Sequence, residues 1–141
     1  MPSRLEKARQ DPNSMKAKIL VAARRIFGEF GYKDTTTRLI AKQVGIDIST
    51  LYYHWGEKQD LYEAVLTDVG DEIQQKLNEI ERKVSGQSLT KRQEIALDMM
   101  CDYLFSYPEV PNLILFGYFN KSPNGVTLDI KISEYVANIA V

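Results

Sequence analysis

Apolar residues recur at helical spacing through most of the 141-residue chain. The first run follows Asn13 and Ser14, and its i, i+3, i+4 pattern consists of Ile19, Ala22, Ala23, Ile26, Phe27 and Phe30. Asn and Ser are common caps at the start of a helix, and Gly31 stands where a glycine usually ends one. We therefore predict a helix between Ser14 and Gly31.

Two short helices are predicted next, over residues 37–56. Thr35–Thr37 can cap the first, which Gly45 interrupts after about two turns. Asp47 can cap the second, whose apolar face consists of Leu51 and Trp55. A short helix, a tight turn with a glycine and a second short helix form a helix-turn-helix motif.

A long helix is predicted over about 57–84. Its apolar residues lie three or four positions apart and make a continuous stripe of Leu61, Val65, Val69, Ile73, Leu77, Ile80 and Val84. After a break at 85–88, another helix is expected over 89–107, which Pro108 stops. A short helix should follow at about 111–119.

The last part of the chain allows two interpretations. Residues 122–125 predict a turn, and the apolar residues after it stand at helical spacing: Leu128, Ile132, Tyr135, Val136 and Ile139. A strand is the alternative over 126–132, where apolar and polar residues alternate. A helix is favoured because every neighbouring segment is helical, so the sequence predicts an all-α fold.

The formal net charge of −1 hides an uneven distribution along the chain. Residues 1–60 contain 11 Lys and Arg against 7 Asp and Glu, whereas the other 81 residues contain 7 against 12. A basic first part favours a polyanionic partner such as nucleic acid. This charge asymmetry is modest, so it supports a nucleic-acid partner only if the sequence also contains a nucleic-acid-binding motif.

The composition excludes several other classes of protein. With 44% hydrophobic residues the chain can bury a core and is not intrinsically disordered. No apolar stretch reaches the ~18 residues of a membrane span, and the polar N-terminus is unlike a secretory signal, so we expect a cytoplasmic protein. One histidine and one cysteine cannot form a His/Cys zinc site, and we find no catalytic constellation or phosphate-binding glycine loop. We expect no enzyme activity, cofactor or metal, and interpret Cys101 as a small buried residue in preference to a redox switch.

The predicted helix-turn-helix has a packed side and an exposed side. Ala41 allows the two helices to cross closely, and the expected core around it is Ile40, Val44, Ile46 and Leu51. The exposed side of the last helix carries Ile48, Ser49, Thr50, Tyr52 and Tyr53. Tyrosines and hydroxyls on the outside of a short helix suit insertion into the major groove of DNA.

Phosphate contacts are expected around this helix. Thr37 stands at a helix N-terminus, and Arg38, His54 and Lys58 can donate to phosphate oxygens; Asp47, the cap, completes the candidate DNA-binding residues. For His54 and Lys58 the alternative is an ordinary solvated surface residue. Three basic residues near the N-terminus form either an arm that reaches DNA or a solvated tail: Arg4, Lys7 and Arg9.

The sequence TTTRLIAKQVGIDISTLYYHWGEKQDLYEAV at 35–65, with AKILVAARRIFGEFGY at 17–32, resembles the DNA-binding domain of the TetR (tetracycline repressor) family of bacterial transcriptional regulators. The resemblance covers about a third of the chain, and its segments occur in register. It implies that the third helix of the domain reads bases and that phosphates are bound by Thr37, Arg38, Tyr52, His54 and Lys58. Two departures are Ile48, where many relatives have a small or polar residue, and Trp55, where phenylalanine is frequent.

The resemblance also implies a division into two parts. Residues 1–56 would hold the arm and the DNA-binding domain, and 57–141 a helical regulatory domain for ligand binding and dimerisation. A homodimer would bind a palindromic double-stranded DNA operator, usually to repress transcription, and a small-molecule effector would release it. Composition alone suggests the pocket residues, because methionines and aromatic residues suit an apolar ligand: Met99, Met100, Tyr103, Phe105, Tyr107, Phe116, Tyr118 and Phe119.

Relatives usually continue for two or more helices that commonly supply the dimer interface. This chain ends at Ile139-Ala140-Val141 without a helix stop signal, so we expect the regulatory domain to be incomplete. Two other classes compete with a ligand-responsive regulator. A DNA-binding architectural module would have a solid second half without ligand-induced stabilisation, and a helical interaction protein would require an accidental motif match.

Overall fold

The computed structural model describes residues 1–119, which form seven helices: α1 (Arg4–Gln10), α2 (Met15–Asp34), α3 (Thr37–Val44), α4 (Ile48–Trp55), α5 (Lys58–Val84), α6 (Leu89–Ser106) and α7 (Glu109–Phe119). Every regular element within these residues is a helix, which confirms the predicted all-α fold. The turn at 122–125, and the helix or strand expected after it, lie outside the described residues.

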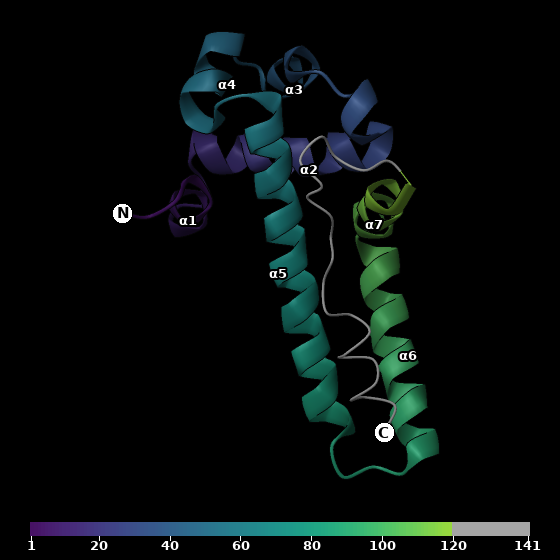
Figure 1. Ribbon diagram of the computed structural model, residues 1–141. Coiled ribbons are helices and arrows are strands. Elements are labelled where there is room, and N and C mark those ends of the chain that lie inside the picture. Colours follow the sequence, from purple (N-terminus) through teal and green to yellow (C-terminus); the bar gives the residue numbers. More distant parts are fainter. Residues whose placement is uncertain (120–141) are drawn as a thin grey trace.

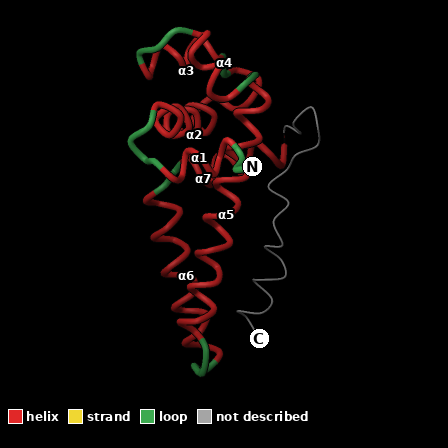
Figure 2. The backbone as a smooth tube through the Cα atoms, turned by 90° about the vertical axis from the view of Figure 1, so that its left-hand side faces the viewer, coloured by secondary structure: helices red, strands yellow, loops and turns green. Residues whose placement is uncertain are grey.

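The first four helices form a head, and we use this name for α1–α4. Figure 1 shows α3 and α4 at the far end of the molecule, with α2 crossing beneath them. Helix α5 starts beside α4 and runs away from the head, and α6 returns along it. Figure 2 shows the same arrangement from the side, and α7 packs back against α2. The long pair α5–α6 is therefore connected to the head at both of its upper ends.

The helix boundaries in the head follow the predicted cap chemistry. Ser14 accepts a hydrogen bond from the Ala17 amide at 3.1 Å, and Thr36 accepts one from the Leu39 amide at 3.0 Å. Gly45 has a left-handed φ of 85° in the turn between α3 and α4. A residue with a side chain would be strained there, so the turn favours glycine.

One boundary differs from the prediction. Gly31 was expected to end the helix that starts after Ser14, but α2 continues to Asp34. Gly31 does leave helical geometry, with φ at 80°, and a last turn resumes behind it. The glycine therefore makes a kink, and the buried hydroxyl of Thr35 donates to its carbonyl at 2.7 Å, which fixes the end of the helix.

A continuous core runs from the head into the long helices. The predicted stripe of α5 is buried in full: Leu61, Val65, Val69, Ile73, Leu77, Ile80 and Val84. In the head, Ile40, Ala41 and Leu51 are buried, and Val44 and Ile46 pack partly buried against them. The helix-turn-helix thus has the core that its sequence predicts, and its orientation is set by burial of apolar surface.

The N-terminal residues form helix α1, which corrects both sequence interpretations of an arm or a tail. A capping box between Ser3 and Glu6 starts the helix, and Leu5 and Ala8 are buried against the core. Arg9 pairs with two carboxylates of α5, at 2.8 Å from Asp68 and 3.0 Å from Asp71. The basic N-terminal segment is therefore packed against α5 and the core. The sequence pattern did not predict this helix because seven residues are too few to show a clear apolar period.

Candidate nucleic-acid interface

Helix α4 is fixed at its start by Asp47. The Asp47 carboxylate accepts hydrogen bonds from the amide of Thr50 at 2.8 Å and from the Thr50 hydroxyl at 2.6 Å. These hydrogen bonds, the hydroxyl first, hold the pKa of the Asp47 carboxyl below its usual range. Asp47 therefore positions the helix with its charged form, and the Thr50 hydroxyl already has a partner.

The other end of α4 is held by two cations from earlier helices. Lys16 of α2 donates from Nζ to the carbonyl of His54 at 2.5 Å, and Arg4 of α1 donates to the carbonyl of Trp55 at 3.0 Å. These carbonyls belong to the last turn, where a helix lacks its own donors and carries partial negative charge. In return, the indole Nε1 of Trp55 donates to the carbonyl of Lys16 at 2.9 Å.

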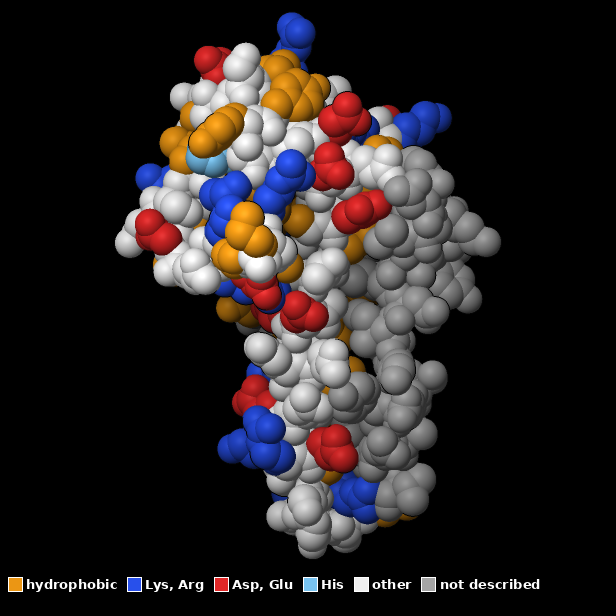
Figure 3. Space-filling model, turned by 60° about the vertical axis from the view of Figure 1, so that its left-hand side comes forward, with side chains coloured by type: hydrophobic (Ala, Val, Ile, Leu, Met, Phe, Trp, Pro, Cys, Tyr) orange, Lys and Arg blue, Asp and Glu red, His pale blue; other side chains and the backbone are white. Residues whose placement is uncertain are grey.

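The outward side of α4 carries most of the predicted base readers. Ser49 is exposed, and the exposed fractions of Tyr52 and Tyr53 are 44% and 82%. Ile48 and Thr50 are half-buried at the edge of this side, and Ile48 packs against the core. Figure 3 shows hydrophobic side chains around the pale blue histidine at this end of the molecule, with lysine and arginine side chains close by. The surface combines aromatic contact with positive charge.

The candidate phosphate-binding residues surround the same surface. Thr37 is the first residue of α3 and is half-buried, while Arg38 beside it is exposed. His54 is half-buried against the ring of Tyr53, with the ring centroids 5.2 Å apart. Burial, with the charge of Lys16 adding to it, lowers the pKa of the His54 imidazole. Both effects disfavour the charged form of the imidazole.

Lys58, the first residue of α5, is not a freely solvated cation. Its Nζ lies 4.3 Å from the centroid of the Tyr32 ring, a cation–π geometry. Burial lowers the pKa of the Lys58 amine, and the charge of Asp34 opposes this shift. The aromatic ring holds the amine in place at the edge of the head.

Sequence reasoning missed Lys16 and Arg4 as residues that support the interface. Both bind backbone carbonyls of α4 from 38 and 51 positions away in the chain. Every residue has a backbone carbonyl, so the identity of the accepting residue does not indicate such a hydrogen bond, and no local sequence pattern could reveal it. Arg4 stood among the basic N-terminal residues, but its partner was unknown.

The predicted effector residues are spread over several environments. Met99 and Met100 are half-buried against the core, Phe116 packs against Gly31 of the head, and Tyr118 and Phe119 have side chains outside the description. Phe105 is 85% exposed, unlike the expected pocket residue. It stands two positions after Tyr103, about 200° around the helix, so it points the other way. Tyr103 and Tyr107 do line a cleft between α5 and α6.

The described residues offer few other sites. Among residues 1–119, no three His, Cys, Asp or Glu side chains are grouped as metal ligands would be. In the same range, no helix is both long enough and apolar enough to cross a bilayer.

Comparison with known proteins finds a likeness that covers most of α2, the helix-turn-helix and the start of α5. A model of bacterial regulatory proteins of the tetR family matches residues 19–65. The HTH-type transcriptional regulator YhgD of Bacillus subtilis is 38% identical over 61 residues, which are 43% of this chain and 32% of that protein. The negative transcriptional regulator IcaR of the icaADBC biofilm operon of Staphylococcus aureus is 47% identical over 49 residues, 35% of this chain and 26% of that protein. The chain thus matches about a third or less of the length of these curated relatives.

Proposed function

We propose that the chain is a transcriptional regulator of the TetR family and places α4 in the major groove of DNA, because its residues 19–65 match the model of bacterial regulatory proteins of that family. Ser49, Tyr52 and Tyr53 are the central base readers, with Ile48 and Thr50 at the edge. One observation carries this assignment. Two tyrosines are exposed on a helix whose opposite face is buried and whose both ends are fixed.

We further propose how the molecule works as a whole. Residues 1–56 act as the DNA-binding domain, and 57–141 belong to a regulatory domain that responds to a small molecule. A homodimer binds a palindromic operator, because two-fold protein symmetry requires two half-sites on one side of the duplex. Repression is the direction supported by the relative IcaR, which is named a negative regulator. The relatives named are regulators, so we propose no catalytic activity.

A selection of binding sites from random duplex DNA tests this function. The purified chain is incubated with the pool near physiological salt, because non-specific binding falls steeply as salt rises. A two-fold symmetric enriched site is expected. An enriched single half-site would contradict the homodimer, and a pool without enrichment would contradict sequence-specific binding.

Tyr52→Ala is expected to weaken binding to the selected operator by about tenfold to a hundredfold, the usual cost of losing one base-reading side chain of ~1–3 kcal/mol. Non-specific binding should change little. Tyr52→Phe separates the hydroxyl from the ring. Fluorescence anisotropy on operator and scrambled duplexes measures both, and parent-like operator affinity in Tyr52→Ala would show that α4 is placed wrongly.

Lys58→Ala is expected to weaken binding to operator and scrambled DNA alike, since a phosphate contact carries no sequence information. The slope of log K against log salt should become shallower by about one unit. Lys91→Ala is the matched control, because Lys91 is an exposed lysine in the first turn of α6, away from the head. Equal slopes for the parent and Lys58→Ala would remove Lys58 from the phosphate contacts.

A further inference from the structure

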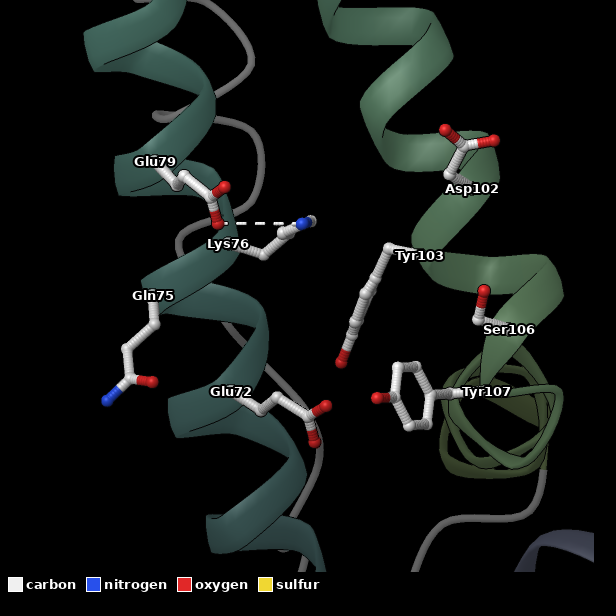
Figure 4. Close-up of a pocket in the computed structure, with 8 residues that line it drawn as sticks. All are labelled: Glu72, Gln75, Lys76, Glu79, Asp102, Tyr103, Ser106 and Tyr107. Atoms are coloured by element: carbon white, nitrogen blue, oxygen red, sulfur yellow. Dashed lines mark hydrogen bonds and ion pairs between the residues drawn. The ribbon is translucent and has the colours of Figure 1, made fainter.

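The cleft between α5 and α6 is lined by polar and charged side chains, unlike the apolar pocket that the composition suggests. Its volume is about 340 Å³, and the walls consist of Glu72, Gln75, Lys76, Glu79, Asp102, Tyr103, Ser106 and Tyr107 (Figure 4). The lining contains three carboxylates and one ammonium group, and the remaining side chains carry hydroxyl or amide oxygens. The cleft is therefore rich in hydrogen-bond acceptors and negatively charged.

Tyr103 supplies a polar group without a partner. Tyr103 is 5% exposed, and within the described residues its hydroxyl has no hydrogen bond of ordinary geometry, with the Glu72 carboxylate as its acidic neighbour. Burial raises the pKa of the Tyr103 phenol, and the charge of Glu72 adds to this effect. Figure 4 shows the hydroxyls of Tyr103 and Tyr107 and the carboxylate of Glu72 turned toward one another. A buried hydroxyl without a hydrogen bond costs stability, so its persistence in a cleft indicates a place for a ligand donor.

The charges of the cleft are only partly neutralised within the chain. Glu79 pairs with Lys76 at 3.5 Å, whereas Asp102 has no cationic partner among the described residues. Glu72 shares Arg24 with two other carboxylates, Asp68 at 3.8 Å and Glu109 at 3.0 Å. A further positive charge placed between α5 and α6 would be attracted from both ends of the cleft.

The distance between the carboxylates indicates the shape of a cationic ligand that could bind in the cleft. Glu72 and Glu79 are seven residues apart on α5, which corresponds to about 10 Å along the helix axis. The described carboxylates are not grouped closely enough to hold one metal ion. An elongated organic cation with an amine at each end fits this separation.

We propose that the α5–α6 cleft binds a linear aliphatic polyamine. One ammonium group lies between Glu72, Tyr103 and Tyr107, where it donates to the Tyr103 hydroxyl and faces two aromatic rings. The other lies near Glu79 and Asp102. The polyamine is then the effector class of the regulator, and this part of the inference rests on the proposed function.

The position of Glu72 gives the ligand a route to the head. The same carboxylate binds Arg24 of α2, so an ammonium group that draws Glu72 into the cleft weakens this link between α2 and α5. Operator binding should fall as a result, because the two heads of a dimer must keep a fixed spacing.

Calorimetric titration of the full chain with spermidine, without DNA and in 0.15 M NaCl, tests the site. Saturable binding with one spermidine per chain is expected, and the neutral 1,8-octanediol should give no binding heat. Tyr103→Phe should weaken spermidine binding about fivefold to tenfold through loss of one hydrogen bond to a charged donor. This variant keeps the ring and removes a hydroxyl without a partner, so it should fold as the parent does.

Glu79→Gln and Glu81→Gln form a matched pair on α5, since they remove the same charge but only Glu79 lines the cleft. Glu79→Gln should weaken binding at least threefold and Glu81→Gln should not. Absence of saturable binding, equal binding of the diol, or parent affinity in both Tyr103→Phe and Glu79→Gln would overturn the proposal. Operator selection without spermidine gives an independent result, so failure of the site and failure of the regulator function are distinguishable.

Discussion

Trp55→Ala is expected to lower the free energy of unfolding by about 3–5 kcal/mol, the usual cost of removing a buried large aromatic side chain. Trp55, the last residue of α4, is 1% exposed, and its indole donates a hydrogen bond to the start of α2. The substitution leaves a cavity, removes the indole donor of the Lys16 carbonyl and takes away the ring that lies 5.4 Å from the Lys16 amine. Helix α4 should lose its fixed orientation before the rest of the core is affected.

Urea unfolding followed by far-ultraviolet circular dichroism measures this effect, because every regular element of the described chain is helical. Trp55→Phe is the matched control. It keeps an aromatic ring and loses the indole donor, so it should cost about 1–2 kcal/mol, which combines the lost volume with the loss of one hydrogen bond. A change below about 1 kcal/mol for Trp55→Ala would contradict the view that this residue anchors α4.

The same residue explains how far the sequence predicts the head. Asp47 as a cap, Gly45 in the turn and Trp55 on the packed face are local signals, because each depends on neighbours within four residues. The hydrogen bonds of Trp55 with Lys16 and Arg4 join segments far apart in sequence. Such contacts depend on how helices cross, which periodicity alone does not determine.

The candidate sites divide in the same way. The outward placement of Tyr52 and Tyr53 follows from a helix whose opposite face is apolar, so sequence predicts it. The surroundings of Lys58 depend on Tyr32 from another helix, and composition gave no means to find them. Composition also favoured an apolar effector pocket, whereas the cleft at Tyr103 is acidic because α5 contributes carboxylates there. The residues that the sequence prediction named as pocket lining all follow α5 in the chain, so the prediction did not include the α5 wall that faces α6.

Arg24 joins the head to helices α5 and α7. It lies on α2, with a side chain 15% exposed, and pairs with Glu72 of α5 and Glu109 of α7. Burial opposes its charge, but the carboxylates, Glu72 foremost, outweigh burial and keep the pKa of the guanidinium above its ordinary value. Next to it, a side chain at Gly28 would come within 2.6 Å of the Glu109 Cβ. Helices α2 and α7 therefore pack closely around one shared cation.

Arg24→Ala is expected to lower the free energy of unfolding by about 2–3 kcal/mol, because removal of one partner of a largely buried ion pair leaves the other charges uncompensated. Asp68, Glu72 and Glu109 would then repel one another, and the ring of Tyr107, 5.8 Å from the guanidinium carbon, would lose its cation.

Arg25→Ala is the control for Arg24→Ala, since Arg25 is the exposed neighbour on the same helix and its loss should cost less than about 0.5 kcal/mol. Urea unfolding in 0.1 M and 1 M NaCl separates charge repulsion from lost packing. The deficit of Arg24→Ala should shrink at high salt, because the Debye length falls from about 10 Å to about 3 Å. Equal stabilities of the two variants would mean that the three carboxylates do not need Arg24. In that case Arg24 would not hold the head to α5 and α7, and withdrawal of Glu72 by a ligand could not reach the DNA-binding surface through Arg24.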